Sequence, residues 1–338
     1  MVNFAEFGNE LYNGTRSYGF VAKRKIWFTI AVILVVASIL VPLLRGGFNL
    51  GIEFRGGSEF TVSHVHDTST LKGKDAVSSV VPGTIPRVTS VAGDTMQIQT
   101  DKLSDDQTLK VKDALMKTYN VGESDIASTF IGPTWGADVT RQAIIGLIVF
   151  VMLAAVLMAL YFRTWKMSLS AVLGLLFVIF TTAGLYAASD FEVTPSAIIG
   201  FLTILGYSLY DTVVVFDKIR ENTSGVTAST RRTFGEEVNL AVNQTLVRSI
   251  NTMMVAVLPV GSVLFIGSYL LGAGTLRDLS LSLFIGIIIS TLSTIFVAAP
   301  LYAAFRQGEP ELVKQAKRVH SRRAAAGAQA EDESVATA

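Results

Sequence analysis

Apolar residues gather into six long runs along the chain, and polar residues separate these runs. The hydrocarbon layer of a membrane is roughly 30 Å thick, so a helix of about 20 apolar residues can cross it. The pattern predicts transmembrane helices at 26–44, 143–162, 167–188, 195–216, 250–271 and 279–305. We therefore expect a polytopic α-helical membrane protein with six transmembrane helices.

The first run follows a polar N-terminal segment, residues 1–25, that ends in Lys23, Arg24 and Lys25. A secretory signal peptide would have a shorter apolar core and a small-residue cleavage site at its end. Here the apolar residues continue to Leu44, so an uncleaved helix is expected. Basic residues remain preferentially in the cytoplasm, which predicts a cytoplasmic N-terminus.

Residues 45–140 form a polar insert with short-period alternation, which we expect outside the cell. Its glycine pairs, Gly46-Gly47 and Gly56-Gly57, predict turns. The patterns predict strands at 59–65, 87–90, 95–100 and 126–131, and helices at 71–81 and 104–119, the second capped by Ser104. This β-α-β-β-α-β order is typical of an α+β ferredoxin-like domain.

The remaining residues, 141–305, are expected to form a five-helix bundle with a cytoplasmic loop at 217–245. Basic residues concentrate on the loops that share a side with the N-terminus, whereas the short loop 189–194 has two acids and no base. Both termini are therefore expected in the cytoplasm. The tail, 306–338, begins basic and could contact anionic lipid or ribosomal RNA, although a solvated tail is favoured. From Arg323 its Ala-rich, acidic composition predicts disorder.

Composition supports the membrane class and excludes several kinds of site. The 338 residues are 50% hydrophobic and 16% charged, and the net charge of +1 does not indicate a nucleic-acid surface. No cysteine is present, so disulfides and thiolate-ligated metals are excluded. His64 and His66 would share one face of a strand and could hold a metal, but an exposed pair is the favoured interpretation.

The insert shows no catalytic triad, glycine-rich phosphate loop or carboxylate dyad, and Asp105-Asp106 is interpreted as a helix start. We therefore predict no enzymatic activity, no cofactor and no metal.

The fourth predicted span contains an acid, Asp211, well inside its apolar run. An ionised Asp at mid-membrane costs roughly 2.5–3.5 kcal/mol, so it indicates function or a specific structural partner. Helical spacing places Gly200, Thr203, Tyr207 and Ser208 on or near its face. Two interpretations remain open at this point: a functional carboxylate, or a structural one hydrogen-bonded to a neighbouring helix.

The fifth predicted span carries a second polar face, with Gln244, Arg248, Asn251 and Thr252. Arg248 lies near the same end of the bundle as Asp211, so the two could meet. An opposite charge would hold Asp211 ionised and burial would favour its protonated form, which suits a group that exchanges a proton. Alternatively, Arg248 extends to the lipid headgroups.

The sixth predicted span places Ser282, Gly286 and Ser290 at four-residue spacing. Small residues so placed let two helices approach closely, which is a packing signal without chemistry.

Several of these segments resemble motifs of one known family. GYSLYDTVVVFDKIREN (206–222), FNLGIEFRGG (48–57), IGPTWGADVTRQA (131–143), LVRSINT (246–252) and GTLRDLSLSLFIGIIISTLSTIFVAAPL (274–301) resemble motifs of the SecF family, within the RND superfamily. The resemblance runs from about residue 25 to residue 305. The long tail and the sequence Leu209-Tyr210-Asp211 in the fourth predicted span resemble those of actinobacterial members.

The resemblance implies an auxiliary role in protein export across the bacterial plasma membrane. It implies SecD as partner, with the SecY-E-G channel, SecA and YajC nearby, a preprotein substrate, and use of the proton gradient in late, ATP-independent steps. The resemblance also implies proton coupling by Asp211 and Arg248; Tyr207, Ser208, Asn251 and Thr252 complete the predicted polar set.

One position departs from the family pattern. Many relatives carry a His-Asp pair in the third helix, where this chain has Phe177 and Val178. A proton route through that pair is therefore in doubt, and coupling through Asp211 or mainly through SecD remains open. Two other functions are also open: an RND-type exporter of small molecules or lipids, and a scaffold that only holds SecD.

Overall fold

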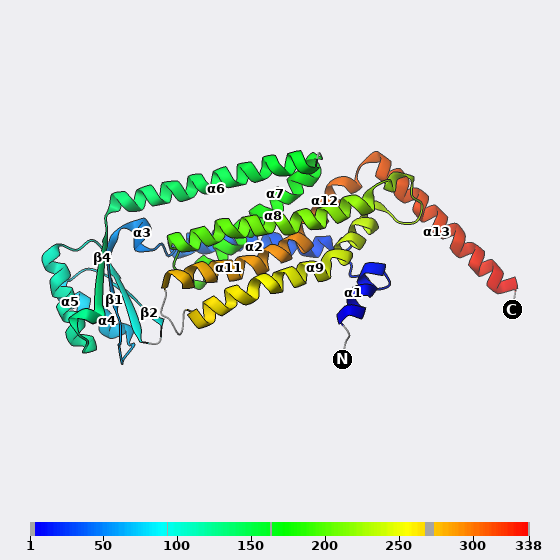
Figure 1. Ribbon diagram of the computed structural model, residues 1–338. Coiled ribbons are helices and arrows are strands. Elements are labelled where there is room, and N and C mark those ends of the chain that lie inside the picture. Colours follow the sequence, from blue (N-terminus) through cyan, green and yellow to red (C-terminus); the bar gives the residue numbers. More distant parts are fainter. Residues whose placement is uncertain (1–3, 93, 163, 268–273, 337–338) are drawn as a thin grey trace.

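The computed structural model describes the chain except residues 1–3, 93, 163, 268–273 and 337–338 (Figure 1). Long helices lie side by side along one direction, with a small sheet domain at one end and both termini at the other. Within the described residues, six helical stretches are long and apolar enough to cross a membrane: Arg24–Arg45, Thr134–Phe162, Trp165–Ser189, Pro195–Ala228, Phe234–Gly267 and Leu276–Gln307. The predicted architecture of six spans is confirmed.

The sheet domain has the predicted order of elements. Its strands are β1 (Gly57–Val62), β2 (Arg87–Ala92), β3 (Thr95–Thr100) and β4 (Ile126–Ile131), and its helices are α4 (Thr70–Val80) and α5 (Asp105–Tyr119). The sheet is antiparallel in the order β2-β3-β1-β4, as in ferredoxin-like domains.

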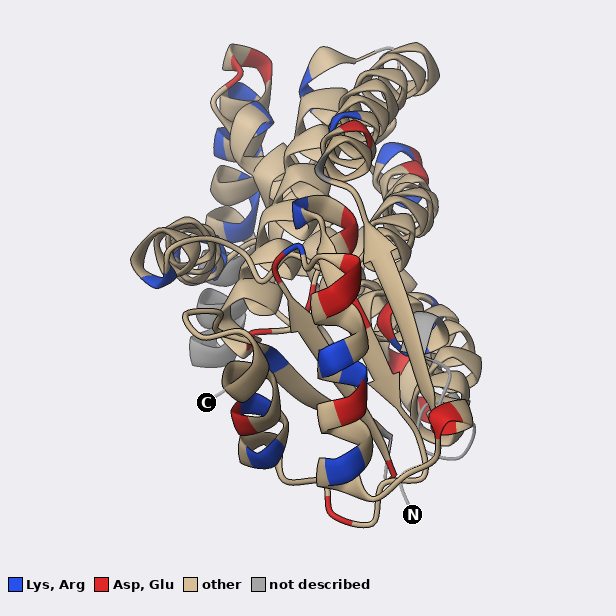
Figure 2. Ribbon diagram, turned by 90° about the vertical axis from the view of Figure 1, so that its left-hand side faces the viewer, with Lys and Arg blue, Asp and Glu red and all other residues tan. Residues whose placement is uncertain are grey.

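Side-chain alternation along β1 builds the core of this domain. Phe60 and Val62 are fully buried and pack with Ile98, Val111 and Leu115 beneath the two helices. Ser104 caps α5 as predicted, accepting a hydrogen bond from the Gln107 N–H in a reciprocal capping box. Figure 2 shows that Lys, Arg, Asp and Glu are interspersed on the helices that face the viewer.

The expected histidine pair does not lie on a strand. β1 ends at Val62, and His64 follows in a left-handed conformation with φ 59°. Its Nδ1 lies 3.0 Å from Asp125 Oδ1. Within the described residues no group of three or more His, Cys, Asp or Glu side chains could hold a metal. The sequence predicted too long a strand because the alternation of polar and apolar residues continues past Val62, the last residue of β1 that pairs in the sheet.

Several helices extend beyond their predicted bounds. The helix α6 (Pro133–Phe162) begins inside the expected insert, because Pro133 supplies a φ suited to a first helical position. The helices α8 (Pro195–Thr223) and α9 (Phe234–Ser262) shorten the expected loop 217–245 to residues 224–233. Thr233 caps α9 and forms a capping box with Glu236. Charged residues there continue amphipathic helices beyond the apolar runs.

The other membrane helices are α2 (Arg24–Arg45), α7 (Trp165–Ser189) and α11 (Gly274–Ser293). The helix α9 continues as a π-helical turn, η3 (Val263–Gly267), and residues 268–271 of the expected fifth span lie outside the described residues. A second π-helical segment, η4 (Thr294–Ala298), joins α11 to α12 (Ala299–Gln307). The short elements are α1 (Phe4–Asn13), α3 (Ile52–Arg55), η1 (Glu123–Asp125) and η2 (Val226–Ala228).

The tail helix α13 spans Pro310–Ala336, over residues whose composition predicts disorder from Arg323 (Figure 1). Its alanines and charged residues are strong helix formers, so a composition poor in large apolar residues still folds locally. Near its start, Gln315 is fully buried and donates to the carbonyl oxygens of Ser229 and Arg232 at 3.1 and 2.8 Å. The tail therefore covers the α8–α9 loop.

The N-terminal segment also packs on the bundle. Asn239 on α9 accepts a hydrogen bond from Val21 N at 3.1 Å and donates to the Tyr18 carbonyl at 2.9 Å. Asn243, one turn later, accepts from Tyr18 N at 2.8 Å. Leu11 is fully buried. Within the described part of this segment, residues 11–21 are thus bound to α9 rather than forming a free arm.

The sheet domain joins the bundle through the segment after α2. Leu50 pairs with Val193 as an isolated parallel bridge, and Gln99 donates to Glu192 at 2.6 Å. The turn before β1 requires glycine: Gly57 has φ 144°, and a Cβ there would collide with the Thr100 carbonyl oxygen. The glycine turns predicted from sequence therefore set the entry of β1 into the sheet.

Candidate functional site

The candidate site lies in the bundle, where α8 contacts α9 and the α11–η4 segment. The helix α8 begins with Thr194, whose Oγ1 accepts a hydrogen bond from Ala197 N at 3.2 Å, and Pro195 follows at the first helical position. This start, together with 29 residues of helix, places the middle of α8 deep among apolar neighbours. The polar side chain of Asp211 therefore lies in the interior of the bundle.

Asp211 is 3% exposed. Its Oδ1 accepts a hydrogen bond from Ser249 Oγ on α9 at 2.8 Å. Its Oδ2 is buried and has no hydrogen-bond partner among the described residues. A buried carboxylate that lacks a partner for one oxygen costs free energy, which a proton or an approaching donor would relieve.

Hydroxyl groups continue this polar site toward the sixth span. Thr212 Oγ1 and Thr294 Oγ1 are 3.1 Å apart, and Thr294 is the first residue of the π-helical η4. Ser208 and Ser290 are 2% and 0% exposed, and Ser290 Oγ has no partner among the described residues. Single π-helical turns occur often at functional sites, since they interrupt the regular helix ladder.

The stripe of small residues on the sixth span packs as predicted. A Cβ on Gly200 would collide with Ser282 Oγ, and one on Gly286 would collide with Ile204. The close approach of α8 to α11 therefore requires these glycines. The same four-residue spacing continues to Thr294, so the packing stripe leads directly to the hydroxyl beside Thr212.

Arg248 forms no ion pair with Asp211 among the described residues, so of the two arrangements that the sequence left open, direct pairing is not observed. Arg248 is exposed, and its guanidinium has no ion pair among the described residues. Successive helical residues point about 100° apart, so α9 directs Ser249 at the carboxylate and Arg248 away from it.

The other predicted residues divide between the interior and the surface. The Tyr207 hydroxyl is buried without a partner in the described chain. Asn251 is exposed, and Thr252 donates to the Arg248 carbonyl at 2.9 Å. The structure therefore brings Tyr207 and Ser208 close to Asp211 along α8, but leaves Arg248 and Asn251 on the outer face of α9.

Sequence reasoning missed Ser249, which donates to Asp211. It also missed Thr212, the next residue along α8, and Thr294, whose hydroxyl meets that of Thr212. The available signal was the hydroxyl content of α9 where its apolar run begins, and the continued four-residue spacing on the sixth span. On α7, Val178 is buried and Phe177 lines an apolar hollow with Trp27 of α2. The two positions that depart from the family pattern thus contribute apolar packing.

Comparisons with known proteins agree with these motifs. The profile described as "Protein export membrane protein SecD/SecF, C-terminal" matches residues 110–308, and that of the "SecD/SecF GG Motif" matches residues 43–63. The chain belongs to the SecD/SecF family. The first profile covers Asp211, Ser249 and Thr294, and the second covers the glycine turn before β1.

Two relatives in this family are annotated in actinobacteria. "Protein translocase subunit SecF" of Streptomyces coelicolor is 40% identical, over 98% of this chain and 88% of the relative. The protein of the same name from Mycobacterium tuberculosis is also 40% identical, over 98% of this chain and 76% of its own length.

A solved structure shares the fold. The crystal structure of SecDF from Thermus thermophilus, described as a translocon-associated membrane protein, has a TM-score of 0.75 at 27% identity. The likeness covers 86% of this chain and 39% of the SecDF chain, so this chain spans about two fifths of that protein.

Proposed function

We propose that the chain is an auxiliary subunit of the Sec protein-export translocase that uses the proton gradient in late, ATP-independent steps of translocation. The observation that carries this proposal is Asp211, buried inside a membrane bundle with one oxygen on Ser249 and the other without a partner in the described chain. A single hydroxyl donor leaves room for the carboxylate to gain or lose a proton with a small local rearrangement.

The partner implied by this proposal is SecD. Relatives named SecDF, from Bacillus subtilis and Thermus thermophilus, match over 39% and 37% of their lengths, so related sequence occurs within a larger chain. Here, Arg248 and Asn251 lie exposed on a membrane helix, where lipid tails offer no hydrogen bonds. A SecD helix would satisfy them. The SecY-E-G channel, SecA and YajC are further proposed neighbours, and a preprotein is the proposed substrate.

The proposed orientation places the sheet domain outside the cell and both termini in the cytoplasm. It is supported by the separation of the sheet domain from the two termini along the bundle (Figure 1). Lys23 and Arg24 line one pocket with Arg323 of the tail helix, and Lys166 pairs with Glu309 just before that helix, so these basic residues near the ends of spans lie at the termini end.

The test neutralises Asp211 and measures export. Asp211→Asn is expected to fold and to bind SecD, but to abolish most of the increase in preprotein export that a proton gradient adds at saturating ATP. The amide keeps the shape of the carboxylate and can still accept from Ser249. The assay uses membrane vesicles, with and without a gradient.

Asp217→Asn is the matched control, because Asp217 lies on the same helix but accepts from Tyr161 Oη at 2.6 Å outside the buried site. It should leave the gradient-dependent increment intact. If Asp211→Asn leaves that increment unchanged at equal protein levels, Asp211 is structural and this chain acts as a scaffold. Co-purification with SecD and channel subunits, rather than with exporter components, separates the export role from an RND-type exporter.

A further inference from the structure

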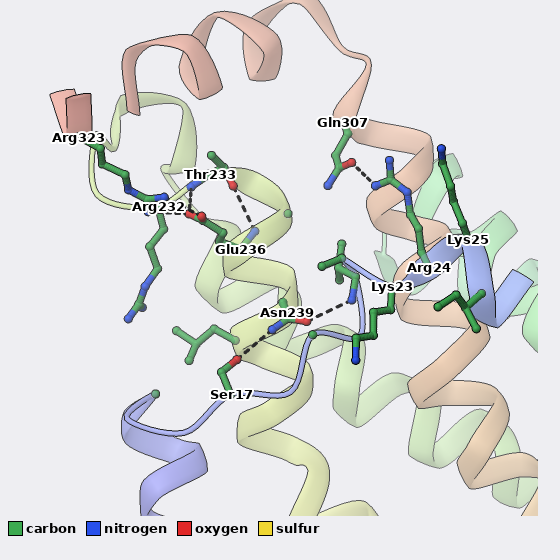
Figure 3. A pocket seen from close by; sticks show the side chains of 17 residues that line it. Ser17, Lys23, Arg24, Lys25, Arg232, Thr233, Glu236, Asn239, Gln307 and Arg323 are labelled. Carbon is green, nitrogen blue, oxygen red and sulfur yellow. Dashed lines mark hydrogen bonds and ion pairs between the residues drawn. The ribbon is translucent and has the colours of Figure 1, made fainter. Parts of the chain in front are cut away.

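A basic pocket of about 750 Å³ lies at the termini end of the bundle (Figure 3). Its walls come from the N-terminal segment, the first residues of α2 and α9, the end of α12 and the tail helix. Lys23, Arg24, Lys25, Arg232 and Arg323 line it, and Glu236 is the one carboxylate among its lining residues. Segments up to 300 residues apart in the sequence therefore place five cations around one hollow.

Most of this positive charge is not neutralised within the protein. Arg323 pairs with Glu236 through two contacts of 2.8 Å, and Arg232 lies 4.0 Å from Glu237. Lys23 and Lys25 have no side-chain partner among the described residues, and Arg24 donates to the neutral amide of Gln307. The three consecutive cations before the first span thus lack a carboxylate.

Several hydrogen bonds that hold the pocket in shape do not involve Lys23 or Lys25. Asn239 donates to Ser17 Oγ at 3.1 Å and accepts from Val21 N at 3.1 Å, which fixes the segment that leads to Lys23 (Figure 3). Glu236 closes the capping box at the start of α9. Lys23 and Lys25 can therefore bind a ligand without being needed for the fold.

A separate apolar hollow of about 270 Å³ lies further along α2, toward the middle of the first span. Ile26 lines the basic pocket, and Ile30, one turn along α2, lines the apolar hollow with Phe177 and Phe296. Trp27 also lines the hollow, and its buried Nε1 has no hydrogen-bond partner among the described residues. Cations, an unused indole donor and an apolar groove thus follow one another along α2.

We propose that this is a binding site for an anionic phospholipid of the adjacent leaflet. The phosphate would lie among Lys23, Arg24 and Lys25, and an acyl chain would follow the hollow beside Ile30. The pocket lies at the start of α2 and of α9 and at the end of α12, which is the depth of the headgroups for a bundle that spans the membrane. A soluble phosphate compound would use the cations but not the hollow.

The test measures lipid binding to the purified full-length chain in neutral detergent by native mass spectrometry. Phosphatidylglycerol is expected to bind at least tenfold more tightly than phosphatidylcholine with the same acyl chains. A juxtamembrane lysine increases the affinity for anionic lipid about fivefold. The double variant Lys23→Gln with Lys25→Gln should therefore bind phosphatidylglycerol roughly 25-fold more weakly. High salt should reduce the difference in affinity between the two lipids, because it screens the charge of the lysines.

The matched control replaces two exposed lysines of the tail helix, Lys314→Gln with Lys317→Gln, and should change binding less than twofold. Arginine at positions 23 and 25 should retain binding, which separates loss of charge from damage to the fold. Equal binding by the Gln variant and the parent, or equal affinity for the two lipids, would overturn the proposal. Competition by glycerol 3-phosphate as effective as that by phosphatidylglycerol would assign a soluble ligand instead.

Discussion

At the residue scale, the environment of Asp211 depends on one hydroxyl. Ser249 supplies its hydrogen bond at 2.8 Å, while the second carboxylate oxygen has no partner in the described chain. The immediately preceding residue, Arg248, points outward. The chemistry of the site is therefore a carboxylate with a neutral donor, and not an ion pair with Arg248, which was one of the two arrangements that the sequence left open.

Ser249→Ala is expected to destabilise the folded chain by about 1–3 kcal/mol, because a buried carboxylate would lose its observed donor. The loss should be smaller in an Asp211→Asn background, since a neutral amide costs less to leave unpaired. Thermal unfolding of the purified chain measures both effects.

Ser262→Ala serves as the control, because Ser262 ends the same helix and its hydroxyl donates only to the Leu258 carbonyl at 2.9 Å. A change within about 0.5 kcal/mol is expected there. Equal effects of the two substitutions would show that the Ser249 contact contributes nothing to stability.

At the scale of elements, the junction between the sheet domain and the bundle is acidic. Burial raises the pKa of Glu192, against the opposing hydrogen bond from Gln99, and Glu59 adds to the rise. Burial also raises the pKa of Glu53 on α3, with Glu192 contributing. These carboxyl groups lie where the loop between α7 and α8 meets β3, so their protonation affects how firmly the two parts join.

The fold is therefore expected to lose stability as pH rises above the ordinary carboxyl pKa of 4.5 toward the raised folded value. In that window the folded state holds more protons than the unfolded state, and such a group stabilises the fold at the acidic end. Glu192→Gln should reduce this slope, measured as melting temperature between pH 5 and 8.

Asp113→Asn on α5 is the control, because Asp113 is exposed and far from the junction in sequence. The slope should survive this change. A parent protein whose melting temperature rises steadily over the same range, with Glu192→Gln behaving identically, would contradict the assignment.

At the scale of the whole molecule, the polar outer face of α9 predicts the proposed SecD interface. The chain contains no cysteine, so each introduced thiol reports on one position. Asn251→Cys is expected to crosslink to SecD in the membrane. Leu157→Cys on α6, which is 63% exposed in the parent, is expected to face lipid and give no SecD product.

The same approach checks orientation. A membrane-impermeant thiol reagent added to intact cells should label a cysteine at position 74 on α4 and spare one at position 314 on α13. Crosslinking of SecD to the α6 position alone would place the interface elsewhere, and labelling of position 314 from outside would reverse the proposed orientation.

Local patterns in the sequence determined the six spans, the order of strands and helices, the Ser104 cap and the glycine turns. Each depends on apolar run length, side-chain periodicity or the backbone preference of one residue, and these act within a few residues. They failed at helix ends, because charged residues continue a helix as readily as they form a loop.

The tertiary structure alone decided which groups meet. The rotation of α9 about its axis places Ser249 against Asp211 and leaves the adjacent residue, Arg248, exposed. No local sequence pattern determines that rotation. The basic pocket likewise depends on hydrogen bonds between Asn239 and the N-terminal segment, which help to place residue 23 in the same pocket as residue 323. Burial of side chains between distant helices sets these positions, because packing fixes helix rotation and approach while local propensity does not.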